Sequence, residues 1–326
     1  MIFEISMLVL GLLVVVKAAD WFLAAAESIG VRLGLSPFVL GVLLVGFGTS
    51  LPELTTSLAS VIDGVNHVAI ANIVGSNLAN ILVILGISTF FMGTINFDKD
   101  LIDIDLPLLI GVTSLFGIMI SDGNLSSFDG VLLLTGFFGY VLYTITYREK
   151  NEYHQGLVGL VASLIKGTDR QVVEIDVKPK QNLATSIFML CASLILLGLA
   201  SKLAVDNLLQ IVEHVNYQVD KLTFFTLAIG TSLPELVVSL KALRRGQGDV
   251  VLGNILGSSI FNILMVGGVS SLVADQHISE SLVWWSIGGL VLASMLLVVS
   301  GITRRIHAWE GSIYLLVYLA LATKLI

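Results

Sequence analysis

Two identical seven-residue segments of this chain each carry a carboxylate side chain. The sequence GTSLPEL occupies 48–54 and recurs 182 positions later at 230–236, so that Glu53 and Glu235 are equivalent. Hydroxyl side chains precede each glutamate by four and three residues, namely Thr49 and Ser50 in the first copy and Thr231 and Ser232 in the second. In a helix, these spacings bring the hydroxyls and the carboxylate to one face. Oxygen-only ligand sets suit hard cations such as Ca2+ and Na+, so each segment predicts part of a cation site.

The duplication extends into the next apolar segment. Four residues recur at the same offset of 182 positions: Asn72, Gly75, Ser76 and Asn80 reappear as Asn254, Gly257, Ser258 and Asn262. The serine and the asparagine four residues after it share one helical face in each copy. One polar position departs from the match, since Ser259 stands where the first copy has Asn77. We conclude that the chain is an internal duplication.

The composition places these polar residues in a membrane. Of the 326 residues, 56% are hydrophobic and only 13% are charged, and the mean hydropathy is +0.94. The apolar stretches run for roughly 20 residues, long enough to cross a bilayer core of about 30 Å as helices. The alternating segments of about ten residues that a membrane barrel needs do not occur. Cys191 is the single cysteine, which excludes a disulfide framework and a cysteine-ligated cluster.

The hydropathy pattern predicts an all-α polytopic membrane protein with ten transmembrane helices. The predicted spans are 2–29, 36–62, 68–92, 104–121, 128–147, 182–204, 221–243, 248–273, 281–302 and 309–325. They form a first five-helix repeat at 1–147, a linker at 148–181 and a second five-helix repeat at 182–326. Within the linker, 157–165 is apolar but too short to span, and we expect a short surface helix there. Because each repeat has an odd number of spans, the second enters the membrane from the opposite side, so the repeats are inverted.

The basic residues predict the orientation. With the N-terminus outside, most of the 17 Lys and Arg residues fall in the linker or in inside connections, including the pairs at 244–245 and 304–305. We therefore expect a multi-pass protein of the cell (inner) membrane, with both termini outside and the central linker in the cytoplasm. A weaker sequence match relates the first and sixth spans, since Asp20 and Glu27 are seven residues apart, as are Asp206 and Glu213.

The two glutamates need a partner of opposite charge. Both fall near the centres of their predicted spans, where an ionised carboxylate costs about 2.5 to 3.5 kcal/mol to insert. The spans at 36–62, 68–92 and 248–273 contain no Lys or Arg. A bound cation is therefore the expected counter-charge for Glu53 and Glu235.

Two prolines add to the supply of oxygen ligands. Pro52 and Pro234 cannot donate to the carbonyls four residues earlier, at Gly48 and Gly230, so carbonyl oxygens are free where a cation could use them. For any single serine or glycine of the motifs, bonding back to its own helix or close helix packing is an equally good interpretation. That interpretation fails for the glutamate pair. No HExxH motif or nucleophile elbow occurs, so an enzyme is not expected.

The paired motifs resemble those of a transporter family. GTSLPEL followed by NIVGSNLANIL, and GTSLPEL followed by NILGSSIFNIL, resemble the two alpha repeats of the calcium/cation antiporter superfamily. These repeats would occupy 46–86 and 228–268 here. The length and span count are similar to the prokaryotic sodium/calcium exchanger (YrbG-like) branch. The resemblance implies exchange of Ca2+ against Na+ by alternating access, with the first and sixth helices sliding across a stationary core.

The resemblance also implies a set of ion ligands. A Ca2+ site would use the carboxylates of Glu53 and Glu235 and the carbonyls of Thr49 and Thr231. Flanking Na+ sites would be lined by Ser50, Ser76, Ser232 and Ser258 and by the carbonyls of Gly46 and Ala228. Asn80 and Asn262 would lie at the centre. Some relatives, the potassium-dependent exchangers among them, have aspartate at the position of Asn262. An amide adds no negative charge, so K+ co-transport is not expected.

Three functional hypotheses remain open at this point. The first is a Na+/Ca2+ antiporter whose site is complete within one chain. The second keeps the fold but couples to H+ or another cation, because a buried glutamate can itself carry the proton. The third is a divalent-cation channel, which is disfavoured because channels are commonly rings of subunits around one pore. None of the three requires a cofactor, since Ca2+, Na+ and H+ are cargo.

Overall fold

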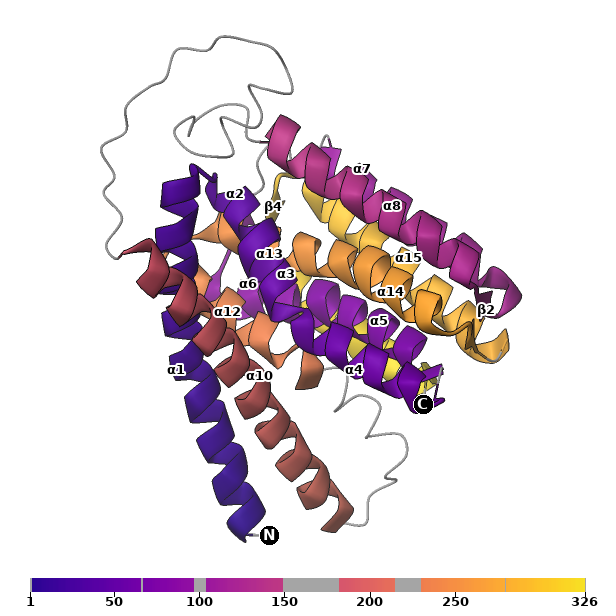
Figure 1. The fold of residues 1–326 in the computed structure, drawn as a ribbon, viewed down its shortest axis with the longest axis horizontal. Coiled ribbons are helices and arrows are strands. Elements are labelled where there is room, and N and C mark those ends of the chain that lie inside the picture. The colour runs from indigo at the N-terminus through magenta and orange to yellow at the C-terminus, as the bar shows by residue number, and fades with distance from the viewer. Residues whose placement is uncertain are drawn as a thin grey trace.

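The chain is almost entirely helical in the computed structural model, which describes residues 2–65, 67–96, 104–148, 182–214, 230–278 and 280–325 (Figure 1). Seven helices in these ranges are long and apolar enough to cross a membrane, and two shorter apolar helices cover Leu106–Asp122 and Ala308–Thr323. The predicted all-α membrane class is therefore confirmed. Ala228, the predicted surface helix at 157–165 and nearly all of the linker lie outside the described residues.

The first half of the chain contains, in order, α1 (Ile2–Leu33), α2 (Pro37–Leu40), the π-helical turn η1 (Gly41–Gly46), α3 (Phe47–Thr49), α4 (Leu51–Ile62), α5 (His67–Leu78), the π-helical turn η2 (Ala79–Ile84), α6 (Leu85–Met92), β1 (Ile95–Asn96), α7 (Leu106–Met119), η4 (Ile120–Asp122), β2 (Asn124–Leu125), α8 (Ser127–Tyr143) and η5 (Thr144–Arg148). The second half contains α10 (Leu183–His214), α12 (Leu233–Arg244), α13 (Gly248–Phe261), the π-helical turn η6 (Asn262–Val266), α14 (Gly267–Val273), β3 (Gln276–His277), α15 (Glu280–Ile302), β4 (Arg305–Ile306) and α16 (Ala308–Leu325).

The largest departure from the predicted spans is in α10. This helix continues to His214, whereas hydropathy ended the sixth span at 204. Asp206 lowers the hydropathy of this stretch without interrupting its backbone hydrogen bonds, so the apolar segment ends before the helix does. Of the predicted span 221–243, the structure describes the part that begins at Gly230, which includes α12.

The two halves of the chain pack against each other throughout. Helix α1 packs along α10, α8 packs against α14, α6 against α16 and α7 against α15. In Figure 1, α1 and α10 lie side by side at one edge of the molecule, with the remaining helices packed together beside them. Two short antiparallel strand pairs also join the halves, β1 with β4 and β2 with β3. If the chain crosses the membrane ten times, β1 and β4 lie in connections on one side of the membrane, and β2 and β3 lie in connections on the other side.

Glycines allow η1 and α13 to cross at close range. A Cβ atom added at Gly257 would lie 2.8 Å from the Cα atom of Val42, and one added at Gly41 would lie 2.6 Å from the carbonyl oxygen of Val250. Only residues without a side chain fit at such a crossing. The crossing brings the segment that precedes Glu53 against the helix that carries Ser258. The fold thus joins the two sequence motifs at its centre.

Candidate cation site

Both repeated motifs contain a helix break just before the glutamate. The backbone leaves the regular helical conformation at Ser50 (φ −85°, ψ 6°) and at Ser232 (φ −84°, ψ 10°), and α4 and α12 begin at the next residue with proline in the first turn. Proline is favoured there because it has no N–H to leave unpaired. Glu53 and Glu235 therefore lie in the first turn of a new helix, where the helix dipole favours negative charge.

Each glutamate is paired with a serine of the other repeat. The hydroxyl of Ser50 donates to Oε1 of Glu235 over 3.1 Å, and the hydroxyl of Ser232 donates to Oε1 of Glu53 over 3.4 Å. The two carboxyls are neighbours, and each residue is only 1% exposed. The second oxygen of each, Oε2, is buried and has no hydrogen-bond partner. The ion pairs found among the described residues involve neither glutamate, so both carboxyls have an unused acceptor and no basic partner there.

An asparagine holds the backbone of each glutamate in place. Nδ2 of Asn72 donates to the carbonyl of Glu53 over 3.1 Å and to the hydroxyl of Ser57 over 3.0 Å. Its Oδ1 accepts from the hydroxyl of Thr231 over 3.5 Å. The same three contacts recur in the second repeat, where Asn254 bonds to the Glu235 carbonyl (3.3 Å), Ser239 (2.8 Å) and Thr49 (3.3 Å). The sequence showed these asparagines only as repeated letters, and their offset of 182 was the signal of a shared role.

The remaining serines of the motifs also contact the opposite repeat. The hydroxyls of Ser76 and Thr231 lie 3.3 Å apart, and Ser258 donates to the carbonyl of Gly46 over 3.0 Å. That carbonyl also accepts from the backbone N–H of Ser50 over 3.2 Å. Ser76 and Ser258 are completely buried. The structure therefore brings these predicted ligands into one network, in which the predicted Gly46 carbonyl already accepts protein hydrogen bonds.

The two predicted central asparagines, Asn80 and Asn262, lie in the π-helical turns η2 and η6 and are almost fully buried. Such turns occur frequently at functional sites. Neither amide atom of Asn80 has a hydrogen-bond partner. Asn262 donates through Nδ2 to Oδ1 of Asn77 over 3.4 Å, and its own Oδ1 has no partner. Buried polar atoms without partners are uncommon, and these amide oxygens are free to accept from a water or bind an ion.

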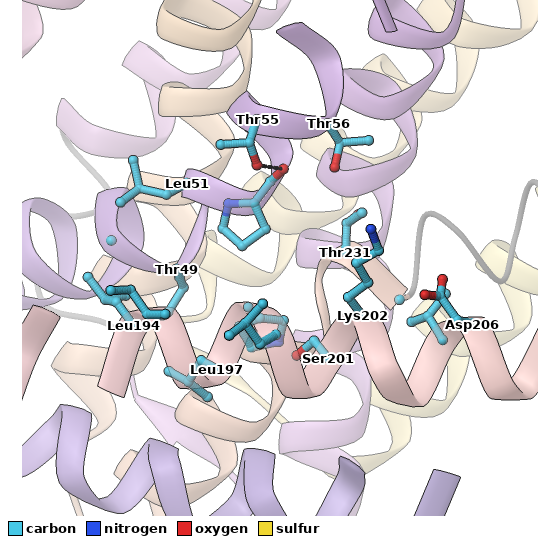
Figure 2. A pocket seen from close by; sticks show the side chains of 18 of the residues that line it. Thr49, Leu51, Thr55, Thr56, Leu194, Leu197, Ser201, Lys202, Asp206 and Thr231 are labelled. Atoms are coloured by element: carbon cyan, nitrogen blue, oxygen red, sulfur yellow. Dashed lines mark hydrogen bonds between the residues drawn. The ribbon is translucent and has the colours of Figure 1, made fainter. Parts of the chain in front are cut away.

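A cavity of about 600 Å3 reaches the site from one side. Figure 2 shows it between α10, which contributes Leu194, Leu197, Ser201, Lys202 and Asp206, and the α3–α4 segment, which contributes Thr49, Leu51, Thr55 and Thr56. Thr49 and Thr231, whose carbonyls are predicted Ca2+ ligands, both line it. The cavity therefore ends against the two turns that precede the glutamates.

On α1, the face that lies against the α3–α4 segment is closely packed. Phe22 is fully buried, and its ring lies against Gly48, where an added Cβ atom would be 3.3 Å from Cζ. Ion pairs between α1 and the C-terminal end of α12 hold this contact: Asp20 with Lys241 (2.8 Å) and with Arg245 (3.4 Å), and Glu27 with Arg245 (2.8 Å). The sequence does not predict these pairs, because the partners are more than 200 positions apart.

Comparison with known proteins identifies the family of this chain. The family model described as sodium/calcium exchanger protein matches residues 3–146 and 185–326. The chain belongs to this family. Among curated relatives, inner membrane protein YrbG of Escherichia coli is 32% identical over 281 residues, covering 85% of this chain and 82% of YrbG. Sodium/calcium exchanger MaX1 of Methanosarcina acetivorans is 28% identical and covers 96% of this chain and 95% of its own length.

A solved structure extends the comparison to the fold. The sodium-calcium exchanger NCX_Mj, soaked with 100 mM Na+ and 10 mM Sr2+, matches this structure with a TM-score of 0.79 and 29% sequence identity. The match covers 98% of this chain and 97% of NCX_Mj. The family predicted from the two repeat motifs is therefore confirmed, and the arrangement of the described helices is that of an exchanger.

Proposed function

We propose that this chain is a secondary antiporter that exchanges Ca2+ for Na+ across the membrane. One observation carries the proposal: Glu53 and Glu235 are both buried and each is bonded to a serine of the other motif, with one unpaired oxygen and no basic partner among the described residues. Two ionised carboxylates balance one Ca2+. Membership of a family with members such as MaX1, a sodium/calcium exchanger, supports the same ions as cargo.

In this proposal, the carboxylates and the carbonyls of Thr49 and Thr231 bind Ca2+. The hydroxyls of Ser50, Ser76, Ser232 and Ser258 and the carbonyls of Gly46 and Ala228 contribute to flanking Na+ sites. Asn80 and Asn262 supply neutral oxygens at the centre. The unpaired Oε2 and amide atoms support this assignment, because they offer acceptors that the protein leaves unused.

Exchange requires that the two ions do not bind together. Ca2+ and a full set of Na+ would need the same two negative charges, and charge repulsion is strong in a buried site of low dielectric. Occupancy by one ion type therefore excludes the other. A site with this property supports antiport when it is reached from one side of the membrane at a time.

Alternating access would come from movement of α1 and α10 over the remaining helices. The two helices are joined to each other by a hydrogen bond of 2.9 Å between Ser28 and Ser186 and by close packing of Gly11 against Ala204. They can therefore move as a pair. The cavity along α10 is the open route in this structure, and the packed face of α1 is the closed one.

The membrane placement follows from the basic residues and the domain boundaries. We place both termini outside, the linker at 148–181 in the cytoplasm, and inverted five-helix repeats at 1–147 and 182–326. In this orientation the cavity along α10 opens to the outside, because Asp206 lies toward the outer end of that helix. The inner membrane is the location that the name of the relative YrbG gives for that protein.

Uptake of radioactive Ca2+ into proteoliposomes tests the proposal. Vesicles loaded with Na+ and diluted into Na+-free buffer should accumulate Ca2+, and vesicles with equal Na+ on both sides should not. Uptake driven by a proton gradient instead of Na+ would favour the H+-coupled alternative. Ca2+ flux that needs no cation on the opposite side would favour a channel and contradict exchange.

A further inference from the structure

The two repeats differ where their asparagines meet. Asn77, which is 1% exposed, accepts a hydrogen bond through Oδ1 from Nδ2 of Asn262 over 3.4 Å. The equivalent position in the second repeat is Ser259, whose hydroxyl is buried without a partner. Asn80, the counterpart of Asn262, correspondingly has no partner for either amide atom. The Asn77–Asn262 contact therefore has no equivalent in the other half of the site.

This contact decides which atom of Asn262 is available to a cation. An asparagine side chain ends in an acceptor oxygen and a donor NH2 group, and only the oxygen can bind a cation. Because the NH2 group of Asn262 is engaged by Asn77, the unpaired atom is Oδ1. The amide of Asn80 has no such constraint. Its oxygen must be oriented by the ion itself, which lowers the net affinity gained from that ligand.

We propose that Asn77 is a positioning residue, which holds the amide of Asn262 with its oxygen toward the bound cation and so makes the second repeat the pre-organised half of the site. The inference rests on the proposed function. It adds a residue that would not contact the ion itself. Pre-organisation of this kind acts on ion affinity, and it leaves the rate of the transport step unchanged.

The test compares Asn77→Ala with Ser259→Ala, the mirrored position. For Asn77→Ala we expect the half-saturating concentration of Na+ or Ca2+, whichever contacts Asn262, to rise about tenfold, the size of one lost hydrogen bond. Maximal Na+-driven Ca2+ uptake should stay within twofold of the parent. Ser259→Ala should change neither quantity, because the Ser259 hydroxyl makes no hydrogen bond to another residue. Reduced maximal uptake with unchanged half-saturation for both ions would contradict the proposal.

A second measurement separates positioning from packing. In an Asn262→Asp background there is no NH2 group for Asn77 to hold and either carboxylate oxygen can bind the cation, so Asn77→Ala should then change half-saturation much less than it does in the parent. Equal effects in both backgrounds would contradict the proposal. Thermal unfolding of the purified variants with Ca2+ alone or Na+ alone gives the affinities without transport. A parent protein that neither ion stabilises would contradict the proposed function, whereas unchanged stabilisation of Asn77→Ala would contradict only the role of Asn77.

Discussion

Ser50 of the first repeat donates a hydrogen bond to the Glu235 carboxyl of the second, with 3.1 Å between Oγ and Oε1. The reciprocal contact, from Ser232 to Glu53, is 3.4 Å long. Each glutamate is thus held by its own helix and by a hydroxyl of the other repeat. Neither repeat alone contains a complete site, and any movement that separated α3–α4 from α12 would break both contacts.

We expect Glu53→Gln and Glu235→Gln each to abolish Na+-driven Ca2+ uptake. Each substitution keeps the size of the side chain but removes half of the negative charge that balances one Ca2+. Uptake into proteoliposomes measures the effect, and size-exclusion chromatography of the purified protein checks folding. Asp63→Asn is the matched control, because Asp63 is an exposed acidic residue at the end of α4. Robust uptake by either glutamine variant would reject the shared-carboxylate site.

We expect Ser50→Ala and Ser232→Ala to weaken Na+ dependence more than they lower maximal uptake. Each removes a hydroxyl oxygen and a hydrogen bond to a carboxyl, worth about 1.5 to 3 kcal/mol, which corresponds to an increase in half-saturating Na+ of roughly tenfold or more. Titration of Na+ in the uptake assay measures it. Thr135→Ala removes an exposed hydroxyl that bonds only to its own helix in α8. A similar change in that variant would show that the effect is not specific to the site.

The sequence predicted which residues form the site better than it predicted the hydrogen bonds between them. Seven identical residues and a constant offset of 182 located Glu53 and Glu235, and helical spacing placed Thr49 and Ser50 near Glu53. Spacing along one helix carries no information about a partner on another, so the bond from Ser50 to Glu235 could not be predicted. The same limit hid the contact between Asn77 and Asn262.

The fold shows a similar division between what was predicted and what was not. Hydropathy located the apolar helices because the bilayer requires long apolar runs. It ended the sixth span ten residues before the end of α10 at His214, because charged residues can continue a helix beyond the membrane core. The π-helical turns that carry Asn80 and Asn262 have no pattern in a single sequence, since they differ from α-helix only in their hydrogen bonds.

We expect Gly257→Ala to destabilise the protein, whereas Gly111→Ala should not. The new methyl group at 257 would lie 2.8 Å from the Cα atom of Val42, at the crossing of η1 and α13. Overpacking of this kind costs about 1 to 3 kcal/mol. At Gly111, in α7, no atom lies within 4 Å of an added Cβ, so alanine should be neutral or slightly stabilising. Thermal unfolding in detergent measures both, and equal stability of the two variants would contradict the close crossing.

We expect alkaline phosphatase fused after residue 326 to be active in bacterial cells, and a green fluorescent protein fused there to be dark. The excess of Lys and Arg in the linker and the inside connections predicts this orientation. Fusions that end within the linker at 148–181 should give the opposite pattern. An active phosphatase at both positions would contradict the proposed topology.

We expect Asp20→Asn to reduce the population of the conformation in which the cavity along α10 is open. Asp20 lies 2.8 Å from Lys241 and 3.4 Å from Arg245, and these pairs hold α1 against α12 on the closed side. The positions 182 residues before Lys241 and Arg245 are Ala59 and Asp63, so the mirrored end of α4 has no basic residue to pair with an acidic residue of α10. Partly exposed ion pairs contribute roughly 0.2 to 1 kcal/mol each, so the loss of both pairs predicts a decrease of about two- to thirtyfold in the ratio of open to closed molecules.

A cysteine introduced at Thr56, which lines that cavity, measures this ratio. In a Cys191→Ser background, which removes the single native thiol, a membrane-impermeant maleimide added outside should label Thr56→Cys more slowly when Asp20→Asn is also present. The charge-exchanged variant Asp20→Lys with Lys241→Asp should restore much of the labelling rate, because an ion pair of reversed polarity can form between the same positions. Labelling that is unaffected by Asp20→Asn would contradict a role for these ion pairs in setting the conformation, since α1 would then be held by its apolar packing alone.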